Sequence, residues 1–415
     1  MSEESPRTKG RSEDSSKKDI SATPESILTG GYVADSKQGK KGKRQKRFTV
    51  LDFKKLEPWQ RRRVVGWILG TFIIAVAILA ATCIYLHNAG EEEESSWWDP
   101  NAAWVVDALD DAESKASSYG ATEVTVGSYV DNVTDVSIKN SSYSVTMEVW
   151  FKWDGRPDLD MAHNFGVYKG KVNSREVLVD VTEGTTRYQL VRTSVTASKV
   201  FYTTRFPLGK HQLRLYLESD YGARDVIFNV DRGNCSINDS ARTAGFVVTG
   251  VDWGEAAYTY PNTEGNPTLS EPTTLSEMVT AINLERDGLG LYLKCFIAMY
   301  GTSLWCLIML YICGHHRVDP LGMIPAALFG TVSNIMVGAA LLPDALDAGL
   351  LEFVNCWGIL TILLCAGTII QVNNIRSEHG RKDERFAGFF GRAMFYSIAF
   401  LAVVGNIALP LSAVL

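Results

Sequence analysis

Residues 64–86 read VVGWILGTFIIAVAILAATCIYL and contain no charged side chain. A helix needs about 20 apolar residues to cross the hydrocarbon core of a bilayer, so this stretch predicts a transmembrane helix. It follows a long polar leader and lacks the small-residue cleavage pattern of a secretory signal. We therefore expect a membrane-spanning helix here, rather than a signal peptide or a buried core helix.

Four more apolar stretches lie toward the end of the chain, with only short polar breaks between them. They cover about residues 290–313, 320–342, 349–372 and 387–412. Each is long enough to span a membrane. Five crossings would place residues 87–290 and the carboxyl end on the same side of the bilayer.

Cations gather on one side of this predicted arrangement. They lie before the first span, between the second and third spans, and between the fourth and fifth spans. They are Arg61, Arg62, Arg63, Arg317, Arg376, Arg381, Lys382 and Arg385. Lys and Arg in short loops stay on the cytoplasmic side. We therefore expect a plasma-membrane protein with a cytoplasmic amino terminus, and with residues 87–290 and the carboxyl terminus extracellular or periplasmic.

Charge is divided unevenly along the chain. Residues 1–63 carry 17 Lys/Arg against 9 Asp/Glu, residues 88–290 carry 17 against 31, and residues 291–415 carry 7 against 7. These balances of +8, −14 and 0 make up the formal charge of −6. The polar composition of 1–63 predicts a disordered, basic, cytoplasmic leader. Residues 87–118 are predicted to form an extended, solvated linker, from the like-charge run Glu91–Glu94, and then a short helix through about Ser117, from Asp99 and Pro100 as N-cap and first-turn proline.

Hydrophobicity alternates with a period of two beyond Tyr119. The stretch SVTMEVWFKW at residues 144–153 is one example. Such short alternating runs, separated by Gly, Asn, Asp and Pro, are typical of half-buried strands and predict an antiparallel sandwich over residues 119–287. Cys235 is the single cysteine of this region, so the region cannot close an internal disulfide.

Chemical motifs are scarce in the predicted sandwich. It contains no glycine-rich phosphate loop, no zinc-ligand spacing and no nucleophile elbow. Asp154, Asp158 and Asp160 could bind calcium, although a polar turn is the simpler interpretation. We expect no enzymatic activity, no metal site, no cofactor and no nucleic-acid partner, because no nucleophile, base and oxyanion donor come together.

Four stretches of the chain follow one another in a distinctive order. They are VGSYVDNVTDV at Val126–Val136 with the strand ending at Trp153, RFPLGKHQLRLYL at Arg205–Leu217, ERDG at Glu285–Gly288, and LGMIPAALFGTVSNIMVGAALLPD at Leu321–Asp344. They resemble the first two strands, the signature loop, the junction before the first pore-domain helix, and the pore helix of the pentameric ligand-gated ion channels, the Cys-loop receptor superfamily. The resemblance covers roughly residues 119–415.

Three features depart from the family pattern. No cysteine occurs within residues 196–225, so the defining disulfide is absent, as in prokaryotic members. The family's Phe-Pro-x-Asp loop reads FPLG at residues 206–209, so the acid that usually pairs with the junction arginine is missing. The helix at 64–86 has no counterpart in the family, and it could ring the bundle or float free on its linker.

The resemblance implies a membrane protein of β and α parts. An extracellular, antiparallel, immunoglobulin-like β-sandwich at 119–287 would be followed by a four-helix transmembrane pore domain at 288–415, with the extra transmembrane helix before both. It also implies a homopentamer in a lipid bilayer. The family pattern assigns to the pore Gly322, Ala326, Phe329, Ser333, Met336 and Ala340, with Asp319 at the inner mouth.

Each of these pore assignments has an alternative. The stripe of small and bulky apolar residues could instead pack helices together. A ring of Asp319 carboxylates would favour monovalent cations, but Asp319 could also cap the helix that begins at Pro320. The two roles of Asp319 can coexist.

Coupling and ligand-binding residues are also implied by the resemblance. Arg286 would face Phe206 and Pro207 on one side and Pro343 and Asp344 on the other. Its acidic partner would be Asp344 or Glu218. Aromatic cages hold ligands in this family, which makes Trp150, Tyr221, Tyr258 and Tyr260 the candidates, although aromatic residues in a sandwich are more often core.

The sequence therefore predicts a subunit of a homopentameric, cation-selective, ligand-gated channel, opened by a small molecule, an ion or a proton. A non-conducting membrane receptor or scaffold with the same architecture is the alternative.

Overall fold

The computed structural model describes residues 53, 54, 56–241, 243, 245–263, 265–267, 269–316, 318–343, 347–378 and 383–415. Most of the leader predicted to be disordered lies outside these residues. So do Asp344 and three of the orienting cations, Arg317, Arg381 and Lys382.

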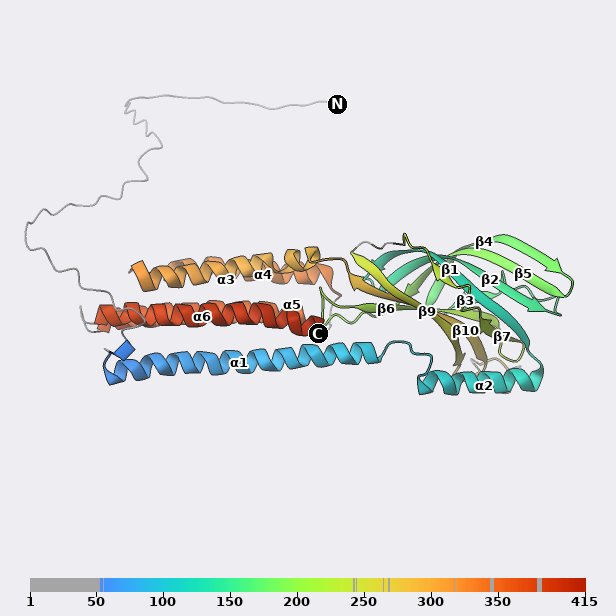
Figure 1. Ribbon diagram of the computed structural model, residues 1–415, viewed down its shortest axis with the longest axis horizontal. Coiled ribbons are helices and arrows are strands. Elements are labelled where there is room, and N and C mark those ends of the chain that lie inside the picture. Colours follow the sequence, from blue (N-terminus) through green and yellow to red (C-terminus); the bar gives the residue numbers. More distant parts are fainter. Residues whose placement is uncertain are drawn as a thin grey trace, which may run out of the picture. The chain divides into compact units, whose positions relative to one another are not determined.

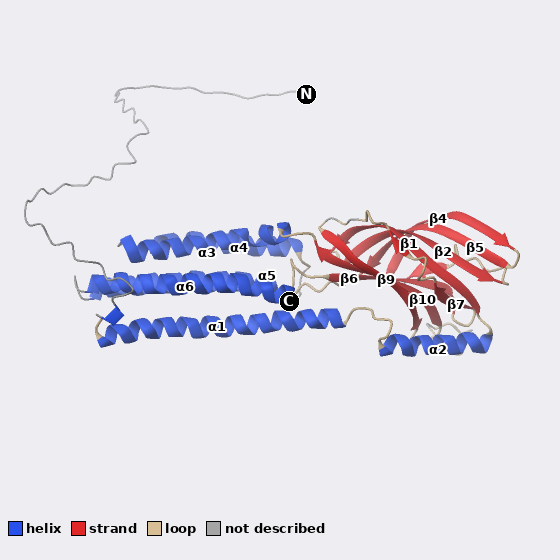
Figure 2. Cartoon of the chain, in the orientation of Figure 1, coloured by secondary structure: helices blue, strands red, loops and turns tan. Residues whose placement is uncertain are grey.

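Within the described part of the chain, five helices are long and apolar enough to cross a membrane, as the sequence predicts (Figure 2). They are α1 (Pro58–Ser95), α3 (Gly290–His316), α4 (Ile324–Leu341) with the short 3-10 helix η2 (Leu321–Met323) before it, α5 (Leu350–Glu378) and α6 (Asp383–Val414). The chain is therefore a multi-pass membrane protein.

The extra helix α1 packs against the bundle instead of floating free. It runs beside α6 (Figure 1). Its aromatic rings meet those of α6 at Trp67–Phe390 and Phe72–Phe400, with centroids 6.2 Å apart in both pairs. Such ring pairs add to the apolar contact between the two helices.

The acidic run after the first span corrects the prediction of an extended, solvated linker. Glu91–Glu94 form the last turn of α1, and Glu93 is buried. A basic side chain far along the chain, Arg205, pairs with both Glu93 and Glu94 and offsets part of their mutual repulsion. The run can therefore remain helical, and the linker before α2 (Ala103–Tyr119) is correspondingly short.

The strands form two sheets. Their bounds are β1 Thr122–Ser137, β2 Ser142–Asp154, β3 Phe165–Val167, β4 Gly170–Glu183, β5 Thr186–Ser198, β6 His211–Gly222, β7 Val226–Val230, β8 Ser236–Ile237, β9 Phe246–Thr259 and β10 Thr274–Arg286. One sheet has the order β4-β5-β2-β1-β7, with β8 also on β1, and the other has the order β3-β6-β10-β9.

Pairing is mixed and not purely antiparallel as predicted. Hairpin neighbours such as β1–β2 and β9–β10 pair antiparallel, but β7 and β8 pair parallel with β1. The reason is that the chain passes from β6 in one sheet to β7 in the other, so no hairpin turn dictates the direction of β7. The alternating positions do face a common core, which contains Val145, Met147, Val149, Phe151, Leu213, Leu215 and Leu217.

The helix α2 covers part of the outer face of the second sheet. It contacts β9, and Val105 packs in a small apolar cluster with Val279 and Ala281 of β10. The remainder of this outer face carries polar and aromatic side chains.

Candidate functional site

The helix α4 has two different faces. Its buried residues recur every three or four positions and pack against α3 and α5; they are Ala327, Thr331, Asn334 and Gly338. Asn334 Nδ2 donates to Asn355 Oδ1 of α5 at 2.6 Å, which fixes the rotation of α4 about its axis. The predicted pore residues from Gly322 to Ala340 all lie on the exposed side.

The two bulky members of the predicted stripe are the most exposed. Phe329 is 75% exposed and Met336 is 68% exposed in a single subunit. Large apolar side chains at such exposure mark surfaces that face another chain, lipid or a pore. Packing within one subunit therefore does not account for this stripe.

Asp319 lies just before this helix and is exposed. Its Oδ1 accepts the backbone N–H of Leu321, the first residue of η2, at 3.0 Å, although the N-cap position itself is occupied by Pro320. Asp319 therefore satisfies a backbone donor of the first turn from just outside the helix, and its Oδ2 makes no hydrogen bond or ion pair with the described residues.

The loop between β5 and β6, Lys199–Lys210, is named here the signature loop. Its central residues, Thr203–Pro207, are buried. The backbone N–H of Leu350, the first residue of α5, donates to the carbonyl of Thr204 at 2.7 Å. Sequence reasoning placed Phe206 and Pro207 at this joint but missed Thr204, because a backbone carbonyl carries no sequence pattern.

The junction arginine has aromatic partners. The guanidinium carbon of Arg286 lies 3.9 Å from the Phe246 ring centroid and 5.5 Å from that of Phe206. Burial lowers the pKa of Arg286 to about 10, so the side chain is still charged at neutral pH. Among the described residues no carboxylate lies within ion-pair distance of it.

Of the two acidic partners expected for Arg286, one lies elsewhere in the sandwich and the other is outside the described residues. Glu218 is instead next to Glu277, so that prediction is wrong. Asp344 lies outside the described residues. Pro343 follows α4 and is half-buried, and Phe206 is the predicted coupling residue that meets Arg286.

A pocket of about 650 Å³ opens on the outer face of the second sheet. Part of its wall is aromatic: the Tyr168 ring lies 5.1 Å from the Tyr258 ring and 6.2 Å from the Tyr216 ring. Trp104 of α2 contributes a further wall. An aromatic wall of this kind suits an organic cation or an apolar ligand.

The four predicted ligand-binding residues do not gather in this pocket. Tyr258 lines it, and Tyr260 touches Tyr258. Trp150 instead covers Gly127 and donates to Asp231, and Tyr221 packs against the sandwich core. The sequence does contain a usable pattern for Tyr216, because it alternates with the core residues Leu215 and Leu217 and so points outward.

Two ionisable side chains that line the pocket, Glu277 and Lys199, have shifted pKa values. Burial, reinforced by neighbouring Glu218, raises the pKa of Glu277 to about 8, so Glu277 is largely protonated at neutral pH. Its Oε1 is buried without a hydrogen-bond partner among the described residues. Burial and the nearby Arg214 lower the pKa of Lys199 to about 8. The pocket can therefore exchange protons with a bound ligand near neutral pH.

Glu277 predicts a pH dependence of stability. The folded state binds its proton up to about pH 8, whereas an unfolded glutamate releases it near 4.5. Raising the pH through this window therefore destabilises the folded state, by up to about 5 kcal/mol. We expect Glu277→Gln, which cannot ionise and can still donate to Glu218, to remove most of the loss.

The measurement is the thermal unfolding midpoint in detergent at pH 5 and pH 8. Glu183→Gln, in the exposed β4–β5 hairpin, is the matched control and should keep the wild-type dependence. An equal pH response in the Glu277→Gln variant and the wild type would show that Glu277 is ionised in the folded state.

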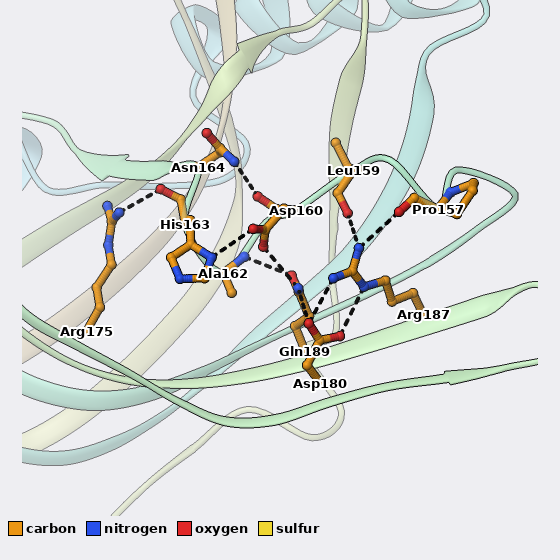
Figure 3. Close-up of polar contacts among 10 residues, drawn as sticks. All are labelled: Pro157, Leu159, Asp160, Ala162, His163, Asn164, Arg175, Asp180, Arg187 and Gln189. Carbon is orange, nitrogen blue, oxygen red and sulfur yellow. Dashed lines mark hydrogen bonds and ion pairs between the residues drawn. The ribbon is translucent and has the colours of Figure 1, made fainter.

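The three aspartates considered for calcium are engaged by protein groups: Asp154 by Thr186, Asp158 by Arg156 and Asp160 by Gln189. Figure 3 shows Gln189 between two carboxylates, with Nε2 donating to Asp160 Oδ1 and Asp180 Oδ2 at 3.0 Å each. Arg187 forms a bidentate pair with Asp180 and donates to the carbonyls of Pro157 and Leu159. These contacts fit a polar turn, and the described residues contain no cluster of three metal-ligating side chains.

The chain was also compared with known proteins. No family model and no curated protein matches it. The residues and their geometry are therefore the basis for assigning a function.

Proposed function

We propose that this chain is a subunit of a homopentameric, ligand-gated channel for monovalent cations in the plasma membrane, of the Cys-loop receptor type without the disulfide. The observation that carries the proposal is the division of α4. Four of its residues pack against α3 and α5, while Phe329 and Met336 lie on the exposed face; the four are Ala327, Thr331, Asn334 and Gly338. A helix that lines a pore formed by several subunits needs one face that packs within its own subunit and another that faces the pore.

In this proposal the exposed stripe of α4 lines the pore. Rings of Phe329 and Met336 side chains form apolar constrictions that close by expelling water. Asp319 contributes a ring of carboxylates at the inner mouth, which attracts cations and repels anions. Residues 87–290 and the carboxyl terminus lie outside the cell.

The ligand is proposed to bind on the sandwich, at the aromatic pocket beside Tyr258. Two contacts support a route from there to the pore. The β10 strand, which carries Glu277, ends at Arg286 over the Phe206 ring. The signature loop is then hydrogen-bonded to α5 through Thr204 and Leu350.

The test is current across a planar bilayer containing the purified chain, recorded while pH, calcium and small amines are varied. We expect cation-selective unitary currents. Asp319→Ala should move the reversal potential in a KCl gradient toward zero, since the carboxylate ring is lost. An unchanged cation preference would remove Asp319 from the selectivity mechanism.

A different result of the same experiment would favour the alternative function, a receptor or scaffold that does not conduct. It would be favoured if the purified chain forms a pentamer but passes no current under any of these conditions, even when Phe329 is replaced by Ala.

A further inference from the structure

The last turn of α1 contacts the signature loop through a buried cluster of ionisable residues. Glu93, Arg205 and His211 are 2%, 4% and 3% exposed. Arg205 Nη2 lies 3.4 Å from Glu93 Oε2 and 3.3 Å from Glu94 Oε1, and His211 Nδ1 lies 3.1 Å from Glu93 Oε1. One helix that the channel family lacks thus holds the loop that the family uses for coupling.

The protonation of this cluster follows from its partners. Burial lowers the pKa of His211, an effect that outweighs the opposing influence of Glu93, so the imidazole is neutral at neutral pH. A carboxylate only accepts hydrogen bonds, so Nδ1 of the neutral ring carries the proton donated to Glu93. Glu93 therefore receives donors from both the loop and the first residue of β6.

A glycine permits this approach. A Cβ on Gly90 would lie 2.7 Å from Arg205 Nη1 and 3.1 Å from its guanidinium carbon. The guanidinium lies against the α1 backbone at Gly90 and is hydrogen-bonded by Glu93 and Glu94, one turn further along the same helix. Any side chain at position 90 would have to displace it.

Two more hydrogen bonds continue the contact beyond Glu93. Trp98 N donates to Gln212 Oε1 at 2.7 Å, and Arg214 Nη1 donates to the Ser96 carbonyl at 3.1 Å. The segment after α1 is therefore attached to β6 as well as to the signature loop. Since α1 also packs along α6, it contacts the transmembrane bundle as well as the loop.

We propose that the carboxyl-terminal turn of α1 is a gating element: Glu93 positions the signature loop through Arg205 and His211, and α1 thereby sets how readily the sandwich opens the pore. This inference rests on the proposed channel function. It assigns to Glu93 and Gly90 a positioning role, because neither touches the pore stripe or the aromatic pocket. Removing one partner of a buried charge pair leaves the other uncompensated, which makes the contact sensitive to single substitutions.

The experiment compares two variants with two controls. Glu93→Gln removes the charge, and Gly90→Ala keeps every charge but displaces the guanidinium. Glu92→Gln is exposed and one residue away, and Gly70→Ala lies on the same helix with nothing within 4 Å of its Cβ. If Glu93→Gln fails to assemble, Gly90→Ala still carries the test.

Open probability in reconstituted bilayers is the first readout, measured for spontaneous openings and for openings evoked by trimethylammonium. We expect Glu93→Gln and Gly90→Ala each to change it by at least about tenfold, equivalent to about 1.4 kcal/mol, with unitary conductance unchanged and the controls within twofold. Unchanged open probability in both variants would overturn the inference.

Hydrogen exchange of the 199–212 segment is the second readout, and it needs no current. Faster exchange in Glu93→Gln, but not in Glu92→Gln, is expected if Glu93 holds the loop. Should the wild-type chain never conduct, the proposed function fails and the gating role fails with it, whereas the exchange data still report the contact. Should the chain conduct and exchange stay unchanged, the gating role alone is overturned.

Discussion

Replacing Phe329 by Ala is expected to open the pore in the absence of ligand. The proposed constriction is closed because a narrow ring of large apolar side chains excludes water. Removing the phenyl groups widens and wets the passage, so ligand-independent current should rise by at least about tenfold, a barrier change of about 1.4 kcal/mol. Phe329 is 75% exposed within a subunit, so the substitution leaves the fold of the subunit intact.

The matched control for this prediction is Leu328→Ala. Leu328 adjoins Phe329, is also exposed at 44%, and lies outside the proposed pore stripe. It should leave the closed state unaffected. Equal currents from the two variants would mean that the constriction is elsewhere, and a closed Phe329→Ala channel would contradict the pore assignment itself.

Gly349→Ala is expected to disconnect the sandwich from the pore. A Cβ at Gly349 would lie 2.5 Å from the carbonyl oxygen of Thr204 and 2.7 Å from its Cα. Both are backbone atoms, so the loop or the start of α5 must move, and the hydrogen bond from Leu350 to Thr204 breaks. We expect ligand-evoked current to fall by about a hundredfold or more, which corresponds to about 2.8 kcal/mol.

Two comparisons separate this loss of coupling from misfolding. The double variant Gly349→Ala with Phe329→Ala should still conduct without ligand, because its pore is open independently of the sandwich. Gly301→Ala, in α3 with nothing within 4 Å of its Cβ, should behave as the wild type. A normal ligand response in Gly349→Ala would show that the contact between Thr204 and α5 does not transmit gating.

The membrane helices were predictable because their determinant is local. A run of about 20 apolar residues is sufficient for a helix that crosses a bilayer, whatever lies elsewhere in the chain. The alternation of SVTMEVWFKW likewise predicted a strand with one buried face, and β2 has that pattern. The exposed stripe of α4 followed from helical spacing, given the register that the family resemblance supplied.

The ligand pocket and the charge cluster were only partly predictable, because their partners are distant in sequence. The sequence suggests Tyr258 as a ligand-binding residue. Tyr168, Tyr216 and Trp104 join it only when the turn after β3, β6, β9 and α2 come together. The sequence predicts a solvated linker at Glu93, because no local pattern points to a guanidinium more than a hundred residues away. The same reason explains why Glu218 was wrongly offered as a partner for Arg286.

Hydropathy and the spacing of apolar residues thus determined by themselves that the described part of this chain has five helices able to cross a membrane, with strands between the first and second of them. Both depend on the free energy of moving nearby side chains out of water. Only the tertiary structure decided that β7 runs parallel to β1, that Gly349 touches Thr204, and that α1 holds the signature loop. Those outcomes depend on which remote backbone and charged groups are brought within contact distance, and short-range patterns in a sequence do not encode that proximity.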